Sequence, residues 1–234
     1  MKKISRSFFY TLFFIGALLG LTLTALAAWA DLEAAAYGFD RTGGGQLSSL
    51  SCPILMTTNE TSSFSVKATN TMQGKLSPSI KTDITSRLMP IASYTHIELA
   101  PGESKRVEWK IGPENVELRQ FIFIRAWVYA SYPIPNRENT CGVFIVHLPS
   151  NGTVITWTMV VLSLLGIGIG LYGLTQTQGP VQSGMDTLRF TLLFFLVIAG
   201  LITSFMGWWI QGVIVIAVSL LLGVVTFGFT ARKL

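Results

Sequence analysis

Few side chains in this sequence could carry chemistry, and their spacing does not assemble a reactive site. His96 and His147 are the two histidines, and neither has a carboxylate or cysteine at a spacing typical of a metal site or a proton-transfer pair. No Gly-x-Ser-x-Gly element marks a nucleophilic serine. We therefore expect no catalytic residue, no metal site, no cofactor and no enzymatic activity.

The segment Gly168–Gly173 matches the G-x-G-x-x-G pattern of dinucleotide-binding loops. That pattern requires a preceding strand within a βαβ unit, whereas this copy lies inside a long uncharged apolar stretch. We therefore reject a nucleotide site. Glycines four residues apart, Gly166 with Gly170 and Gly16 with Gly20, would allow membrane helices to approach closely, or are simply tolerated there.

Cys52 and Cys141 are the two cysteines of the chain. In an exported segment we expect them to form a disulfide, and two unpaired buried thiols are the alternative. Arg125 lies inside the apolar stretch Phe121–Tyr129, where an unpaired charge is costly. We expect Arg125 to form an ion pair or to lie at an edge, with a binding role as the alternative.

Residues 129–137 combine tyrosines and an arginine with two prolines. Tyrosine and arginine are frequent at interaction hot spots, so Tyr129, Tyr132, Pro133 and Arg137 are candidate contacts for a partner. The same composition is also typical of an ordinary loop between two strands.

The composition indicates a membrane protein. Half of the residues (50%) are apolar, 12% are charged and the mean hydropathy is +0.53, whereas about a quarter of the residues in soluble domains are charged. The uncharged stretches 153–185 and 190–231 have room for three helices of about 20 residues each. A further uncharged stretch, Phe8–Ala30, follows a basic start and ends in small residues, so it is either a cleaved signal peptide or a retained signal anchor.

The net charge of +5 indicates orientation rather than a basic binding surface. Basic and acidic residues balance within 31–152, and the excess flanks the apolar stretches on a single side. The positive-inside rule then places both termini in the cytoplasm and residues 31–152 outside. The balance also gives no reason to expect a nucleic-acid partner. Four tryptophans fall at the outer ends of the predicted spans, where we expect them to anchor at the lipid headgroups: Trp29, Trp157, Trp208 and Trp209.

The outer region has the alternation of β-strands. Phe64, Val66 and Ala68 alternate with polar residues, and Pro101-Gly102 marks a turn between two further runs. This pattern predicts an antiparallel, all-β immunoglobulin-like sandwich ectodomain, in addition to the α-helical transmembrane segments.

Residues 60–130 resemble bacterial immunoglobulin-like modules of the cell-adhesion-related type, called CARDB-like. The resemblance lies in Val66-x-Ala68-x-Asn70 and in Leu99-Ala100-Pro101-Gly102-Glu103-Ser104 followed by Val107 and Trp109. It implies a β-sandwich fold and assigns no activity, cofactor or site residue to the chain.

The predicted organisation has eight parts. They are a signal peptide or N-terminal signal anchor (1–30), a flexible tether rich in Gly and Ser (31–51), the extracytoplasmic sandwich (52–149), a transmembrane helix (153–174), a cytoplasmic loop (175–187), two more transmembrane helices (188–206 and 209–230) and a cytoplasmic tail (231–234).

We expect a multi-pass protein of the bacterial cytoplasmic membrane, in contact with the lipid bilayer, that displays this domain as a non-catalytic interaction or accessory module. Its expected partners are other membrane or cell-envelope proteins. An accessory subunit of a membrane-embedded enzyme or transport complex, with the active groups largely in a partner, is the alternative.

Overall fold

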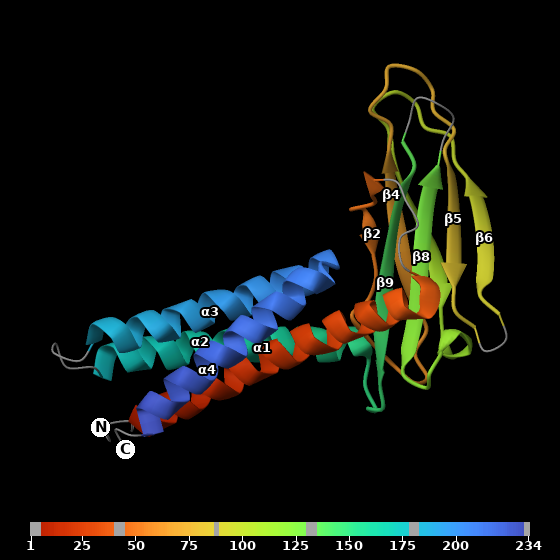
Figure 1. Ribbon diagram of the computed structural model, residues 1–234. Coiled ribbons are helices and arrows are strands. Elements are labelled where there is room, and N and C mark those ends of the chain that lie inside the picture. Colours follow the sequence, from red (N-terminus) through yellow and green to blue (C-terminus); the bar gives the residue numbers. More distant parts are fainter. Residues whose placement is uncertain (1–5, 40–44, 87–88, 130–134, 178–182, 232–234) are drawn as a thin grey trace. The chain divides into compact units, whose positions relative to one another are not determined.

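The computed structural model describes residues 6–39, 45–86, 89–129, 135–177 and 183–231 (Figure 1). The chain divides into two compact units. A helical unit comprises residues 1–28 and 155–234, and a β-domain comprises Trp29–Val154.

Four α-helices account for the apolar stretches of the sequence: α1 (Arg6–Ala34), α2 (Gly152–Thr177), α3 (Ser183–Met206) and α4 (Trp209–Ala231). Three helical segments are long and apolar enough to cross a membrane, namely Arg6–Phe39, Gly152–Gln176 and Leu188–Met206. The part of α4 whose side chains the structure describes is a shorter apolar helix, Trp209–Val225. Helices α3 and α4 pack against each other across a turn at Gly207, which has a φ of 65°.

Within the helical unit, glycines bring α1 and α2 into close contact. A methyl group added to Gly16 would lie 2.7 Å from the backbone nitrogen of Ile167, and one added to Gly166 would lie 2.9 Å from the Cα of Gly16. A methyl group on Gly170 would lie 2.7 Å from the Cβ of Phe13. The interpretation of the four-residue glycine spacing as a helix-packing feature is therefore confirmed.

The β-domain contains two sheets (Figure 1). In the larger sheet the strand order is β1 (Gly45–Gln46), β9 (Arg137–Val146), β8 (Phe121–Tyr129), β5 (Ser79–Ile84) and β6 (Ile91–His96), with β3 (Leu55–Thr57) also paired to β9. The smaller sheet has the order β2 (Leu50–Ser51), β4 (Ser62–Thr69) and β7 (Ser104–Ile111). A short 3-10 helix, η2 (Pro113–Asn115), follows β7.

The prediction of a wholly antiparallel arrangement is wrong for two strand pairs. Both β1 and β3 lie parallel to β9, at its two ends. The reason is that residues 45–57 run alongside β9 in the same direction as β9. Between β1 and β3 the chain leaves the larger sheet, and β2 pairs with β4 in the smaller sheet.

Alternation along the strands produces a core that both sheets share. Phe64 and Ile111 of the smaller sheet are in one buried cluster with Ile122, Ile124 and Val143 of the larger sheet. Since successive residues of a strand point to opposite faces, the residues between them on β8 and β9 face the other side of the larger sheet. That other face carries Phe121, Phe123 and Arg125 of β8 and Glu138 of β9.

The structure differs from the prediction of a flexible tether over 31–51. Residues 31–34 continue α1, and a π-helical turn, η1 (Ala35–Phe39), follows them. Ala34, Phe39 and Leu47 are buried, and β1 and β2 lie in the same segment. The Gly and Ser content indicated backbone freedom, but the few apolar side chains between them find partners in the β-domain.

Candidate functional site

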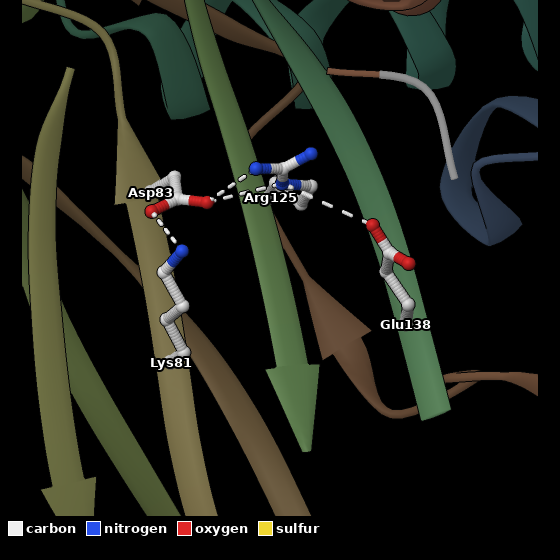
Figure 2. Close-up of polar contacts among 4 residues, drawn as sticks. All are labelled: Lys81, Asp83, Arg125 and Glu138. Atoms are coloured by element: carbon white, nitrogen blue, oxygen red, sulfur yellow. Dashed lines mark hydrogen bonds and ion pairs between the residues drawn. The ribbon is translucent and has the colours of Figure 1, made fainter. Parts of the chain in front are cut away.

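A cluster of four charged side chains lies across β5, β8 and β9 (Figure 2). The Arg125 guanidinium donates to Asp83 Oδ2 from Nε at 3.1 Å and from Nη2 at 2.7 Å. Lys81 Nζ lies 3.4 Å from the other oxygen of Asp83, and Glu138 Oε1 lies 3.9 Å from Arg125 Nε. The cluster therefore contains two cations and two carboxylates that engage one another.

Strand register places these four residues on one face. Arg125 is opposite Asp83 in the β5–β8 pair, and Glu138 is opposite Trp127, which lies two residues from Arg125 on the same face of β8. Lys81 is two residues from Asp83 and shares its face. The expected ion pair of Arg125 is confirmed, and its partner is Asp83. Because the carboxylates and cations of the cluster contact one another, this arrangement favours a structural role for Arg125 over the binding role.

The end of helix α1 covers the neighbouring part of the same face. Ala30, Ala34 and Phe39 form a buried cluster with Phe121 and Phe123 of β8. The Arg125 guanidinium lies 5.8 Å from the centre of the Phe39 ring, so the apolar cluster adjoins the charged one.

A hydrogen bond fixes this helix end to the sheet. The Asp31 carboxylate accepts from the Gly142 amide at 2.7 Å, and both groups are buried. A Cβ on Gly142 would collide with the carbonyl of Ala30, so only glycine allows this approach of helix and strand. Sequence reasoning missed this contact, although Asp31 directly after an uncharged stretch was a usable signal.

The first turn of α2 is also bound to the β-domain. Glu60 Oε2 accepts from the Gly152 amide at 2.8 Å and from the Thr57 amide at 2.9 Å. A carboxylate at a helix N-terminus satisfies an amide that has no partner within the helix and interacts favourably with the helix dipole. Glu60 was not among the residues that the sequence singled out.

The predicted disulfide is present between Cys52 and Cys141, whose Cα atoms lie 6.6 Å apart. Cys141 is buried in the shared core and Cys52 packs against that core. The bridge joins the segment between β2 and β3 to β9.

The predicted contact surface is described in part. Tyr132 and Pro133 lie outside the described residues. Tyr129 packs edge-on against Trp127, with 5.9 Å between ring centres. Arg137 is exposed and lines a cavity of about 300 Å³ together with Leu47, Leu99 and Val128, so it and Tyr129 remain candidate contacts.

The four tryptophans predicted as interface anchors have different surroundings. Trp29 packs on Phe121 and donates from Nε1 to Glu33 at 2.9 Å. Trp157 stacks on Phe205, with 5.7 Å between ring centres, and it is exposed, as is Trp208. Trp209 is the first residue of α4. Their proposed position at lipid headgroups stays a prediction.

The two histidines lie in different surroundings within the part of the β-domain that the structure describes. His96 Nδ1 and Ser79 Oγ are 2.6 Å apart and form a hydrogen bond, and His147 is exposed at the end of β9. Among the described residues no group of three or more His, Cys, Asp or Glu side chains could hold a metal ion.

No family model matches the chain, and no curated protein matches it. Among solved structures it is similar to the CARDB domain of a Pyrococcus furiosus protein, crystallised in complex with di-metal ions. The identity is 17% and the TM-score 0.34, over 42% of this chain and 84% of that domain. The predicted weak resemblance to CARDB-like modules is thus confirmed.

Two further similar structures are carbohydrate enzymes. A Paenibacillus cycloisomaltooligosaccharide glucanotransferase is 10% identical, with a TM-score of 0.33 over 46% of this chain and 15% of the enzyme. A β-glucuronidase from Bacteroides uniformis is 13% identical, with a TM-score of 0.31 over 44% of this chain and 12% of the enzyme. The chain thus spans a small part of either enzyme, and these likenesses say nothing of its function.

Proposed function

We propose that this chain is a multi-pass protein of the cytoplasmic membrane that displays an immunoglobulin-like β-sandwich outside the cell membrane as a non-catalytic interaction or accessory module. The observation that carries this proposal is that the β-domain incorporates the ends of two long apolar helices. Ala30 and Ala34 of α1 are part of a buried cluster of the β-domain, and Glu60 accepts a hydrogen bond from the first amide of α2. Both of these helices are candidate membrane spans.

The assignment as a sandwich is supported by the core. Two buried clusters combine residues of both sheets, and the Cys52–Cys141 bridge lies within one of them. A disulfide is also typical of a domain in an oxidising compartment, which agrees with display outside the cytoplasm.

The role as an interaction module is supported by the charged cluster of Arg125. Its guanidinium pairs with Asp83, which also pairs with Lys81, on a face that the end of α1 partly covers. The Arg125–Asp83 pair links β8 to β5 and so supports the use of the larger sheet as a rigid binding platform.

Reporter fusions test the topology. We expect reporters joined at residue 182 and at the C-terminus to be active only in the cytoplasm, and one inserted at residue 100 to be active only after export. The reverse pattern would overturn the orientation.

Purification in mild detergent tests the accessory role. A chain that binds an external protein ligand without a cofactor supports the interaction module. Isolation as a defined complex with cofactor absorbance, or with transport activity after reconstitution, contradicts it in favour of an enzyme or transport subunit.

A further inference from the structure

The larger sheet ends at β6, an edge strand without charge (Figure 1). Its residues Ile91–His96 include no Lys, Arg, Asp or Glu. The edge strand β7 of the smaller sheet carries four charged residues, namely Lys105, Arg106, Glu108 and Lys110. Charged side chains on an edge strand discourage pairing with another chain. The charges on β7 therefore discourage another chain from pairing with it, whereas β6 has no such charges.

Large apolar side chains are exposed along this edge. Tyr94 is 60% exposed, Ile91 is 49% exposed, and Met89 just before the strand is 77% exposed. Ile91 is opposite Ile84, whose side chain belongs to the shared core, and Tyr94 is opposite Lys81 of the charged cluster. Ile91 and Tyr94 therefore lie on opposite faces of the sheet, beside the same open edge.

The backbone of β6 also has hydrogen-bonding groups directed away from the sheet. Ile97 follows β6 directly, and Pro78 directly precedes β5. The Ile97 amide donates to the Pro78 carbonyl at 3.1 Å. In an antiparallel pair the residues that bond to the partner strand alternate with residues that do not. In the register of β5 and β6, Ala92, Tyr94 and His96 therefore point their N–H and C=O groups outward.

We propose that β6 is a docking edge for a partner protein, which adds an extended segment to the larger sheet as a further strand. Outward N–H and C=O groups in strand spacing are complementary to another strand. To cover both Tyr94 and Ile91, the added segment carries two apolar side chains three residues apart, because residues at an odd spacing lie on opposite faces. It carries no charge between them, since β6 offers none to pair with. This inference rests on the proposed function and assigns its binding surface.

A labelled peptide tests the docking edge. The probe is a fluorescein-labelled, end-blocked six-residue peptide with valine at its second and fifth positions and threonine elsewhere. It is titrated against the purified full chain in detergent micelles and followed by fluorescence anisotropy. We expect saturable binding, and we expect Ala92→Pro to weaken it at least about tenfold, because proline removes an outward N–H and leaves the bonds to β5 in place.

Glu108→Pro is the matched control. The Asn70 amide donates to the Glu103 carbonyl, so by the same alternation Glu108 points its N–H away from β4. Proline there makes the same change on the charged edge, and peptide binding should be unchanged. Circular dichroism of both variants checks that each β-domain is folded.

Three results would overturn the docking edge. They are no saturable binding by the unaltered chain, equal binding by Ala92→Pro, and a dimer of the chain that Ala92→Pro abolishes, which would assign the edge to a second copy. The reporter fusions decide the display topology separately, so a failure of the peptide leaves the topology result intact.

Discussion

The Asp31 carboxylate accepts a hydrogen bond from the Gly142 amide at 2.7 Å, across 111 positions of sequence. Asp31 lies in the last two turns of α1, and Gly142 lies in the middle of β9. This bond makes the helix end part of the β-domain rather than a linker to it. Its contribution to the free energy of unfolding can be measured with substitutions at Gly142 or at Asp31.

Gly142→Ala should destabilise the β-domain. The added methyl group meets the carbonyl of Ala30 on the apposed helix, and both are backbone-anchored, so the helix has to move away from the strand. Overpacking of this kind costs about 1–3 kcal/mol or more. Urea unfolding in micelles, followed by near-ultraviolet circular dichroism, measures the loss.

Gly74→Ala is the matched control for that change. A methyl group at Gly74 meets nothing within 4 Å, so the free energy of unfolding should change by less than about 0.5 kcal/mol. Equal stability of the two variants would contradict the docked helix end.

Asp31→Leu should lower the free energy of unfolding by about 1–3 kcal/mol, because it leaves the buried Gly142 amide without its acceptor. Asp31→Asn keeps an oxygen in the same position and should lose less. Glu33→Gln is a suitable control, because Glu33 accepts from Trp29 at an exposed position. An equal loss in Asp31→Leu and Glu33→Gln would argue against a specific role for Asp31.

Some of these relationships could be predicted from sequence, and others depend on strand register. An arginine in an apolar strand requires a partner, so an ion pair of Arg125 was predictable. Its identity was not, because Asp83 is 42 positions away and faces Arg125 only through the pairing of β5 with β8. The close glycines of α1 and α2 were predictable, since their four-residue spacing itself places them on one helix face.

The helix end shows where the sequence is ambiguous. Small residues such as Ala30 fit a signal-peptidase site, but small size equally allows a helix to approach a strand closely at Gly142. Only the tertiary contact distinguishes the two. The same applies to residues 31–51, where composition indicated a tether and the buried Ala34, Phe39 and Leu47 contradict it.

Loss of the disulfide should destabilise the β-domain strongly. The bridge closes a loop across 89 positions, for which chain entropy predicts up to about 4–5 kcal/mol. Cys52→Ser should therefore lower the unfolding midpoint under non-reducing conditions. The unaltered protein with reductant should unfold at a similar midpoint, and an unchanged midpoint in Cys52→Ser would show that the bridge contributes nothing.

Arg125→Met should lower the free energy of unfolding by more than the Arg125–Asp83 ion pair contributes to it. It leaves Asp83 with Lys81 alone, on a face where the Asp83 side chain is 11% exposed. Removing one member of a buried, hydrogen-bonded charge pair costs roughly 3 kcal/mol, less where solvent reaches the site. The double variant Arg125→Met with Asp83→Leu should recover much of that loss, and a double variant as unstable as the single one would contradict the pairing. Urea unfolding of both variants makes the comparison.

We propose that the N-terminal helix is retained in the mature protein. Signal peptidase acting after Ala27 would cut α1 in two and detach its apolar first part from the β-domain. Acting after Ala30, it would also remove two contacts of the β-domain, Ala30 in the buried cluster and Trp29 on Phe121. Mass spectrometry of the protein purified from membranes should therefore find peptides from within residues 8–27, and a mature N-terminus at residue 28 or 31 would contradict retention. A chain that begins at Asp31 tests how much the removed residues contribute to the stability of the β-domain. Its β-domain should unfold at lower urea than that of the full chain, because Trp29 and Ala30 no longer cover Phe121.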